Sequence, residues 1–246
     1  MTSDPVTSHV VIVTGSSSGI GAATARSFAA TGAGVVVNSV RSVAEGEAVA
    51  ASLPDAVYVQ GDIADPQAAQ NLVDAALDRW GRLDTLVNNA GTTAVIPHDD
   101  LEAASVDVWR RIFEVNVFAT WTMTLAALPA LRQTHGSVVN ISSVAGLRPT
   151  GSSIPYAASK AALNHLTVLL AKVVGPEVRV NAVAPGLIDT PWTADWEFVR
   201  AAVAAVAPLK RIGQPHDVAE VVLALAGAAY VTGQVVAIDG GLTIAL

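Results

Sequence analysis

The stretch that decides the fold is His9-Val-Val-Ile-Val13, followed by Thr14-Gly15-Ser16-Ser17-Ser18-Gly19-Ile20-Gly21. Its first five residues form a short β-branched run, which is typical of a buried strand. A helix-type apolar pattern follows the glycines, continues through Phe28 to about Thr31 and stops at Gly32. A strand, a glycine-rich turn and a helix in this order are the context in which such a turn binds a dinucleotide.

The chemistry of the turn supports a cofactor, although turns rich in Gly and Ser also serve as plain connectors. Glycine lets backbone N–H groups approach a pyrophosphate closely, and the start of a helix favours an anion. We therefore expect cofactor contacts from Gly15, Ser17, Ser18, Gly19, Ile20 and Gly21.

The composition indicates a globular α/β protein. The chain has 246 residues, of which 52% are hydrophobic, enough for one large domain or two small ones. Valine-rich strands alternate with alanine-rich helices, as in layered α/β folds. The net charge is −7 and no Lys/Arg run occurs, so we expect no nucleic-acid or membrane partner. The chain has no Cys, and its five His residues are scattered singly, so we expect no disulfide and no metal site.

The termini and apolar runs favour a cytoplasmic location. Met1–Ser8 is short and polar and lacks the apolar core of a signal peptide. Val221–Ile238 is uncharged and long enough to span a membrane, but Thr232-Gly233-Gln234 interrupts it.

A second motif, Tyr156-x-x-x-Lys160, opens the apolar-periodic run Ala157–Val174. Side chains four residues apart share one face of a helix. A lysine ammonium beside a phenol favours the phenolate, so we expect Lys160 to lower the pKa of Tyr156, as suits a general acid/base. Ser143 follows a strand-like run, Ser137–Ser142, and its hydroxyl could bind a carbonyl or alkoxide oxygen. The Tyr/Lys spacing alone also occurs by chance on many helices.

Taken together, the motifs resemble the short-chain dehydrogenase/reductase family, and most of all its 3-oxoacyl-[acyl-carrier-protein] reductase-like branch. The resemblance spans residues 9–244 in the family's order and spacing. It implies one doubly wound, Rossmann-like α/β domain over residues 1–246, with about seven parallel strands and helices on both faces. The motifs that carry it are Thr14-Gly-x-x-x-Gly-Ile-Gly21, Asn88-Asn-Ala-Gly91, Asn116, Ser143, Tyr156-x-x-x-Lys160, Pro185-Gly186 and Ile238-Asp-Gly-Gly241.

The resemblance also implies catalytic roles. Tyr156 would be the general acid/base, and Ser143 rather than its neighbour Ser142 would orient the substrate oxygen. Lys160 would tune Tyr156 and hydrogen-bond the nicotinamide ribose. Asn116 would kink a helix, which we expect over Val106–Leu131, and free a carbonyl for a proton relay. From the residues alone, Asn116 would be a satisfied core amide.

The end of the second strand, Gly34–Ser39, bears on the choice of cofactor. In nicotinamide folds an acid about 20 residues beyond the glycine loop binds the ribose 2′-hydroxyl. This chain has Ser39 there, followed by Arg41 and Ser42, and the nearest acid is Glu45. A cation and hydroxyls without a competing carboxylate suit a 2′-phosphate, so we expect NADP(H), with NAD(H) possible. Arg41 could instead be an ordinary surface residue.

The family pattern assigns further cofactor contacts. Asp62 and Ile63 would hold the adenine, although Asp62 also suits a turn. The remaining contacts, to the ribose, the nicotinamide and the phosphates, would come from Asn89, Ala90, Gly91, Tyr156, Pro185, Gly186, Ile188 and Thr190.

The C-terminal part raises the questions of substrate and assembly. Pro191–Pro208 carries Trp192, Trp196 and Phe198, which suit either a substrate lid or ordinary helix packing. The apolar end Leu242–Leu246 suggests a homotetramer or a homodimer. Three functions stay open: an NADPH-dependent reductase of a ketone or 3-oxoacyl group, an NAD-dependent alcohol, sugar or steroid dehydrogenase, and a catalytically silent cofactor-binding regulator.

Overall fold

The computed structural model describes residues 9–245, so the predictions for Met1–Ser8 and for Leu246 lie outside the described residues. Its centre is a seven-stranded sheet in the order β3-β2-β1-β4-β5-β6-β7, with every neighbouring pair parallel. The strands are β1 (Val10–Val13), β2 (Gly34–Ser39), β3 (Ala56–Gln60), β4 (Thr85–Asn88), β5 (Ser137–Ile141), β6 (Arg179–Pro185) and β7 (Val235–Ile238).

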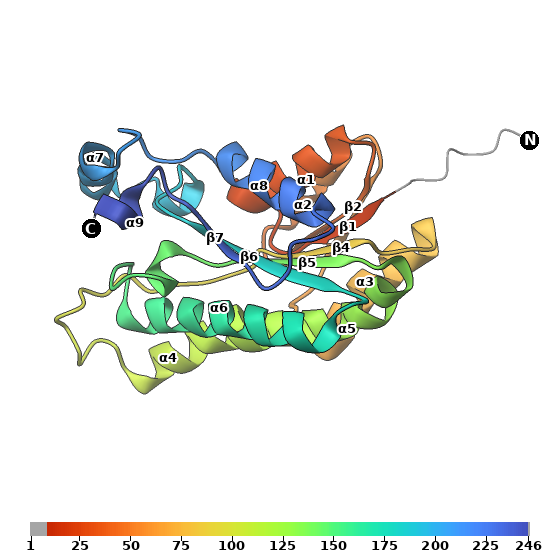
Figure 1. Cartoon of the computed structure of the whole chain (residues 1–246), viewed down its shortest axis with the longest axis horizontal. Helices are drawn as coiled ribbons and strands as arrows, with labels where there is room; N and C mark the ends of the chain where they lie inside the picture. The colour runs from red at the N-terminus through yellow and green to blue at the C-terminus, as the bar shows by residue number, and fades with distance from the viewer. Residues whose placement is uncertain (1–8, 246) are drawn as a thin grey trace, which may run out of the picture.

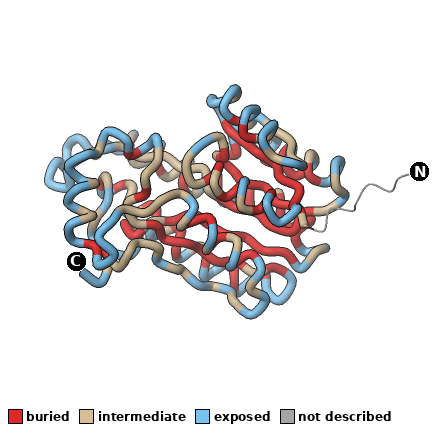
Figure 2. The backbone as a smooth tube through the Cα atoms, turned by 90° about the horizontal axis from the view of Figure 1, so that it is seen from above, coloured by how far each residue is buried: buried red, intermediate tan, exposed pale blue. Residues whose placement is uncertain are grey.

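Helices cover both faces of this sheet, as Figure 1 shows. On one face lie α1 (Gly19–Ala30), α2 (Val43–Ala51) and α8 (Pro215–Gly227). On the other lie α3 (Pro66–Trp80), α4 (Val106–Phe113), α5 (Thr120–Thr134) and α6 (Ile154–Val174). Each face has its own apolar cluster, and the central strands between them are buried, whereas the edge strands β3 and β7 are mostly half-buried (Figure 2). The predicted doubly wound, Rossmann-like α/β fold is confirmed.

The valine-rich strands explain why the sheet is parallel and central. All four residues of β1 and all six of β2 are buried, so side chains on both faces of each strand pack against a helix layer. Burial on both faces is what continuous apolar strands require.

The strand order places a crevice at the carboxyl ends of the strands. The chain moves outward from β1 through β2 to β3, then returns to β4 beside β1 and moves the other way. In such sheets ligands bind where the order reverses. The glycine turn after β1 and Asn88–Gly91 after β4 meet at this point, where Thr14 N donates to Val87 O at 3.0 Å.

The predicted helix over Val106–Leu131 has a break in its middle. A π-helical segment, η1 (Glu114–Ala119), separates α4 from α5. The combined helix Val106–Thr134 is long and apolar enough to cross a membrane by length and composition alone. Its residues Ile112, Met123 and Leu131 are fully buried in the protein. We therefore interpret it as a core helix.

The last part of the chain is less regular. A 3-10 turn, η3 (Pro191–Thr193), leads to α7 (Glu197–Val206), which has no buried residue. The described residues end in a short helix, α9 (Leu242–Ala245), where only an apolar tail was expected. Helix α2 was also not predicted from the sequence.

Candidate active site

One cavity of about 1030 Å³ opens at the carboxyl ends of the strands. Of the predicted site residues, only Asn116 is absent from its lining. The fold thus brings together residues as distant in the sequence as Gly15, Ser143 and Thr190. The predicted residues that line it are Gly15, Ser17, Ser18, Gly19, Ile20, Gly21, Ser39, Arg41, Ser42, Asp62, Ile63, Asn89, Ala90, Gly91, Ser143, Tyr156, Lys160, Pro185, Gly186, Ile188 and Thr190.

Buried side chains hold the glycine turn. The Thr14 hydroxyl accepts hydrogen bonds from the backbone N–H groups of Asn89 and Ala90, each at 3.0 Å. In return, the Asn89 side-chain amide donates to the carbonyls of Thr14 and Gly15 at 2.9 Å. Gly15 has φ +61°, and a Cβ there would lie 2.9 Å from Ala90 Cα. The turn therefore requires glycine for both its backbone angle and its packing.

Asn38 is a second support of the turn that sequence reasoning missed. Its Oδ1 accepts from Gly15 N at 3.3 Å, while its Nδ2 donates to the carbonyls of Val59 and Gly61 at 3.1 and 3.0 Å. Its backbone N–H donates to the Ser16 hydroxyl at 3.0 Å. A buried polar residue in a strand of valines was the available indication, since such a residue needs partners.

The start of α1 fits an anionic cofactor. The N-cap residue Ser18 makes no side-chain cap hydrogen bond, and the first turn contains no acidic residue. This helix end lines the cavity through Gly19, Ile20 and Gly21. Unsatisfied N–H groups and the helix dipole favour a phosphate there. A dinucleotide pyrophosphate thus suits the residues that are present.

The predicted selectivity residues lie at or just after the end of β2 and line the cavity. The Ser39 hydroxyl donates to Ser42 O and pairs with the Tyr58 hydroxyl, both at 2.9 Å. Arg41 is exposed, lines the cavity and forms no ion pair among residues 9–245. Asp62 also lines the cavity, and its Oδ1 accepts from Ala64 N at 3.0 Å, so it does have the turn role considered above.

Ser143, Tyr156 and Lys160 line the cavity from the segment after β5 and from α6. Tyr156 is in the first turn of α6, where Ser153 caps the helix by accepting from Tyr156 N at 3.4 Å. Ser143 lies beside the Tyr156 side chain and favours a lower pKa of its phenol. The Ser142 hydroxyl instead donates to Lys160 O at 3.3 Å, so Ser143 is the serine that faces the phenol.

The expected effect of Lys160 on Tyr156 is not present in this structure. Lys160 Nζ donates to Ile141 O at 2.8 Å and lies 5.8 Å from the centroid of the Tyr156 ring. Burial raises the pKa of the Tyr156 phenol, and only the interaction with Ser143 opposes that rise. Burial also lowers the pKa of Lys160 to about 8. Desolvation disfavours the charged forms of both Tyr156 and Lys160, so the Tyr156 side chain is a protonated phenol at neutral pH.

Asn116 lies behind the cavity wall, in the π-helical segment η1. Its Oδ1 accepts from Thr92 N at 2.8 Å, and its Nδ2 donates to Thr92 O and to the Ser159 hydroxyl, both at 3.0 Å. Ser159 in turn donates to Tyr156 O at 2.7 Å. Asn116 is therefore both a satisfied core amide and part of a helix irregularity, and it links η1 to the turn that carries Tyr156.

Comparison with known proteins agrees with this geometry. A family model described as enoyl-(acyl carrier protein) reductase matches residues 15–243. The chain belongs to the short-chain dehydrogenase/reductase family. Like the other members of that family, it is an oxidoreductase that acts on CH–OH or C=O groups with a nicotinamide cofactor.

Two curated relatives and one solved structure illustrate the similarity. Ketoacyl reductase 2 of the granaticin polyketide synthase from Streptomyces violaceoruber, as that protein is named, is 56% identical over 98% of both chains. A 3-oxoacyl-[acyl-carrier-protein] reductase of Thermotoga maritima is 39% identical over 96% of this chain and 98% of its own. The structure of 3-ketoacyl-(acyl-carrier-protein) reductase from Brucella melitensis, complexed with NADH, has a TM-score of 0.90 and 30% identity over 97% of this chain and 100% of that one.

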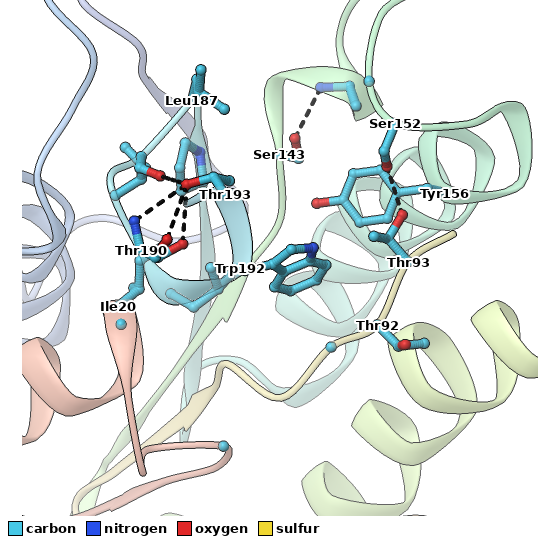
Figure 3. Close-up of a pocket in the computed structure, with 18 of the residues that line it drawn as sticks. Ile20, Thr92, Thr93, Ser143, Ser152, Tyr156, Leu187, Thr190, Trp192 and Thr193 are labelled. Atoms are coloured by element: carbon cyan, nitrogen blue, oxygen red, sulfur yellow. Dashed lines mark hydrogen bonds between the residues drawn. The ribbon is translucent and has the colours of Figure 1, made fainter. Parts of the chain in front are cut away.

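The short-chain dehydrogenase/reductase site is completed by the turn after β6. The Thr193 hydroxyl donates to Ile188 O at 2.6 Å and accepts from Thr190 N at 3.2 Å (Figure 3). The next side chain, Trp192, meets the Tyr156 ring edge to face, with the ring centroids 6.4 Å apart. Thr193, Thr92 and Ser159 were not singled out from the sequence. Thr92 and Ser159 act through Asn116, which lies 24 and 43 residues away, whereas Thr193 bonds its own turn and carried no signal in the sequence.

Proposed function

We propose that this protein is an NADP(H)-dependent reductase that converts the ketone of a 3-oxoacyl-type substrate into an alcohol. The observation that carries the proposal is one cavity lined by both the glycine turn and the Ser143–Tyr156–Lys160 set. The names of two relatives, a ketoacyl reductase and a 3-oxoacyl reductase, support this substrate class.

The proposed roles follow from the contacts of each side chain. The bound cofactor supplies the hydride, and Tyr156 gives its phenolic proton to the developing alkoxide. The Ser143 hydroxyl donates to the same oxygen and stabilises its charge. The raised pKa of Tyr156 keeps the phenol protonated, which favours reduction over oxidation. Lys160, when charged, would restore the proton and bind the ribose, and Asn116 positions the Tyr156 turn through Ser159.

The choice of NADPH rests on Ser39, Arg41 and Ser42. An exposed guanidinium that lines the cavity, with no carboxylate at the end of β2, suits a 2′-phosphate. One observation favours the alternative of an NAD-dependent alcohol, sugar or steroid dehydrogenase: the solved relative was crystallised with NADH. The Ser39 hydroxyl already forms hydrogen bonds with Tyr58 and Ser42, so the proposed preference for NADPH depends mainly on Arg41.

The test is reduction of an acetoacetyl thioester of N-acetylcysteamine, followed by loss of NADPH or NADH absorbance at equal salt. We expect turnover with both cofactors and a kcat/KM at least tenfold higher with NADPH, a difference of about 1.4 kcal/mol. Equal or better turnover with NADH would replace the NADPH assignment by the NAD-dependent alternative. Cofactor binding without turnover on a broad panel of ketones and alcohols would favour a silent regulator instead.

We further propose that the whole chain acts as one domain in the cytoplasm and assembles as a homotetramer or a homodimer. Exposed apolar side chains gather on α5 and α6, and Ile244 near the C-terminus is 83% exposed. Such surfaces usually mark an interface. The α5 and α6 side chains are Trp121, Leu125, Val168, Leu169 and Val173. Light scattering coupled to size exclusion tests the assembly, and a monomer would contradict it.

A further inference from the structure

Trp192 is the aromatic side chain that meets the proposed proton donor. Its indole lies 6.4 Å from the Tyr156 ring, centroid to centroid, with an interplanar angle of 70°. The side chain lines the cavity and stays 47% exposed, so much of its surface is open to a bound molecule. Figure 3 shows the indole beside the Tyr156 hydroxyl, where the ketone must lie for proton transfer.

The backbone that carries Trp192 is fixed. Thr193 is buried, and its hydroxyl bonds Ile188 O and Thr190 N, while Thr193 N donates to Thr190 O at 3.0 Å. The Thr190 and Thr193 side chains and backbones together form a capping box around η3. A surface held in place before binding loses little freedom when a ligand packs on it. Trp192 is therefore a fixed wall, although helix α7 just after it has no buried residue.

The loops around Tyr156 are fixed as well. The Thr93 and Ser152 hydroxyls pair at 2.6 Å, and Ile96 N donates to Ser152 O at 2.8 Å. A Cβ built on Gly151 would lie 3.6 Å from the Tyr156 ring. The space next to the phenol is therefore bounded on both sides by parts of the chain that are held by hydrogen bonds.

From this geometry we propose that Trp192 determines specificity, and that the substrate carries a flat aromatic or conjugated ring next to the ketone. The inference rests on the proposed carbonyl reduction and adds the class of ketone. Aromatic rings attract one another at centroid distances of about 4.5–7 Å, beyond the effect of buried area. The indole lies 6.4 Å from the Tyr156 ring, so a ring whose ketone contacts the Tyr156 hydroxyl can pack against Trp192. A puckered saturated ring of equal size cannot pack flat on it.

The test compares two bicyclic ketones of similar size, β-tetralone, which contains a flat fused ring, and trans-β-decalone, which is saturated. The quantity measured is the ratio of their kcat/KM values with NADPH, because this ratio does not depend on the fraction of active enzyme. Trp192→Ala and Trp192→Phe are compared with the wild type. Trp121→Ala is the matched control, because Trp121 is similarly exposed, at 42%, and does not line the cavity.

We expect Trp192→Ala to lower the ratio about tenfold, mostly through weaker binding of β-tetralone and so a higher KM, a loss of about 1.4 kcal/mol. Trp192→Phe should keep most of the ratio and Trp121→Ala all of it. An unchanged ratio in Trp192→Ala, or an equal fall in Trp121→Ala, would overturn the inference. If the wild type reduces the acetoacetyl thioester but neither ring ketone, only the inference fails. If it reduces no carbonyl at all, the proposed function fails with it.

Discussion

The glycine turn and the segment from Asp195 to Val206 line the same cavity but are built in opposite ways. Around the turn, Thr14, Ser16 and Asn38 are buried and hydrogen-bonded to two neighbouring strands. In the later segment, α7 buries none of its residues, and Phe198 is 87% exposed. The difference indicates that the proposed cofactor-binding end is prearranged, while most of the proposed substrate-binding end can adapt.

The physical basis of this difference is local stability. Segments with few buried apolar contacts unfold locally at a low free-energy cost. A turn held by buried hydrogen bonds opens only when the core unfolds. A cofactor that many related enzymes share requires a binding site of constant shape, whereas the substrates of those enzymes differ in shape. The tightly held and the loosely held parts of the site meet at η3, beside Tyr156. There the buried Thr193 holds the last turn before the loosely packed segment.

The largest expected effect comes from Tyr156→Phe, at this boundary. Removing the hydroxyl deletes the proton donor, so we expect kcat to fall by about 10²–10⁴-fold. The NADPH dissociation constant should change little, because the ring remains to pack. Steady-state kinetics and a fluorescence titration on the same sample check both numbers. Loss of cofactor binding together with turnover would contradict the assigned role.

The comparison itself is tested by two Phe→Ala changes. Phe28 in α1 is 1% exposed, so its truncation should cost about 3–5 kcal/mol of unfolding free energy. Phe198 in α7 has almost no packing to lose, so its truncation should stay within about 0.5 kcal/mol. Urea denaturation measures both. Similar losses at the two positions would mean that α7 is not the loosely held region described here.

Gly21→Ala is expected to distort the glycine turn without changing Ser143, Tyr156 or Lys160. A Cβ at this position would lie 2.5 Å from both Gly15 O and Asn89 Nδ2, so the turn must shift. We expect NADPH to bind at least tenfold more weakly, about 1.4 kcal/mol. Gly227→Ala is the matched control, since a Cβ there meets nothing within 4 Å. Equal affinity in the two variants would show that the turn is not prearranged.

Arg41→Ala should change the preference between cofactors more than overall activity. Losing a charge-assisted hydrogen bond to the 2′-phosphate costs about 1.5–3 kcal/mol, so NADPH should bind at least tenfold more weakly. NADH lacks that phosphate, and its affinity should remain. Parallel titrations measure the two constants. Equal losses of affinity for both cofactors would mean that Arg41 does not bind the 2′-phosphate.

The smallest effect should be a pH dependence of reduction. Burial lowers the pKa of Lys160 to about 8, so the ammonium is present below that pH and is lost above it. The neutral amine no longer favours proton return to Tyr156, and reductive kcat/KM should decline as the pH rises through about 8. A profile that stays flat to higher pH would mean that the Lys160 charge is not required.

Much of the fold could be predicted from the sequence, because valine runs, glycine turns and alternating helices are local features. The three strands given as ranges, His9–Val13, Gly34–Ser39 and Ser137–Ser142, match β1, β2 and β5 to within one residue, and the predicted cofactor residues line one cavity. Asn38, Thr92 and Ser159 were missed because each acts through a partner on a distant segment. The pKa of Tyr156 was predicted in the wrong direction, since the spacing to Lys160 shows proximity but not burial.

The most direct test of the central claim is deuterium transfer from NADPH that carries deuterium at both hydrogen positions of nicotinamide C4. The labelled cofactor is incubated with the acetoacetyl thioester and the wild-type protein, with Tyr156→Phe in parallel, and the product is analysed by mass spectrometry. The account predicts a 3-hydroxyacyl product that carries one deuterium on the carbinol carbon in the wild type, and almost none of that product from Tyr156→Phe. An unlabelled alcohol, or equal product from the variant, would contradict it.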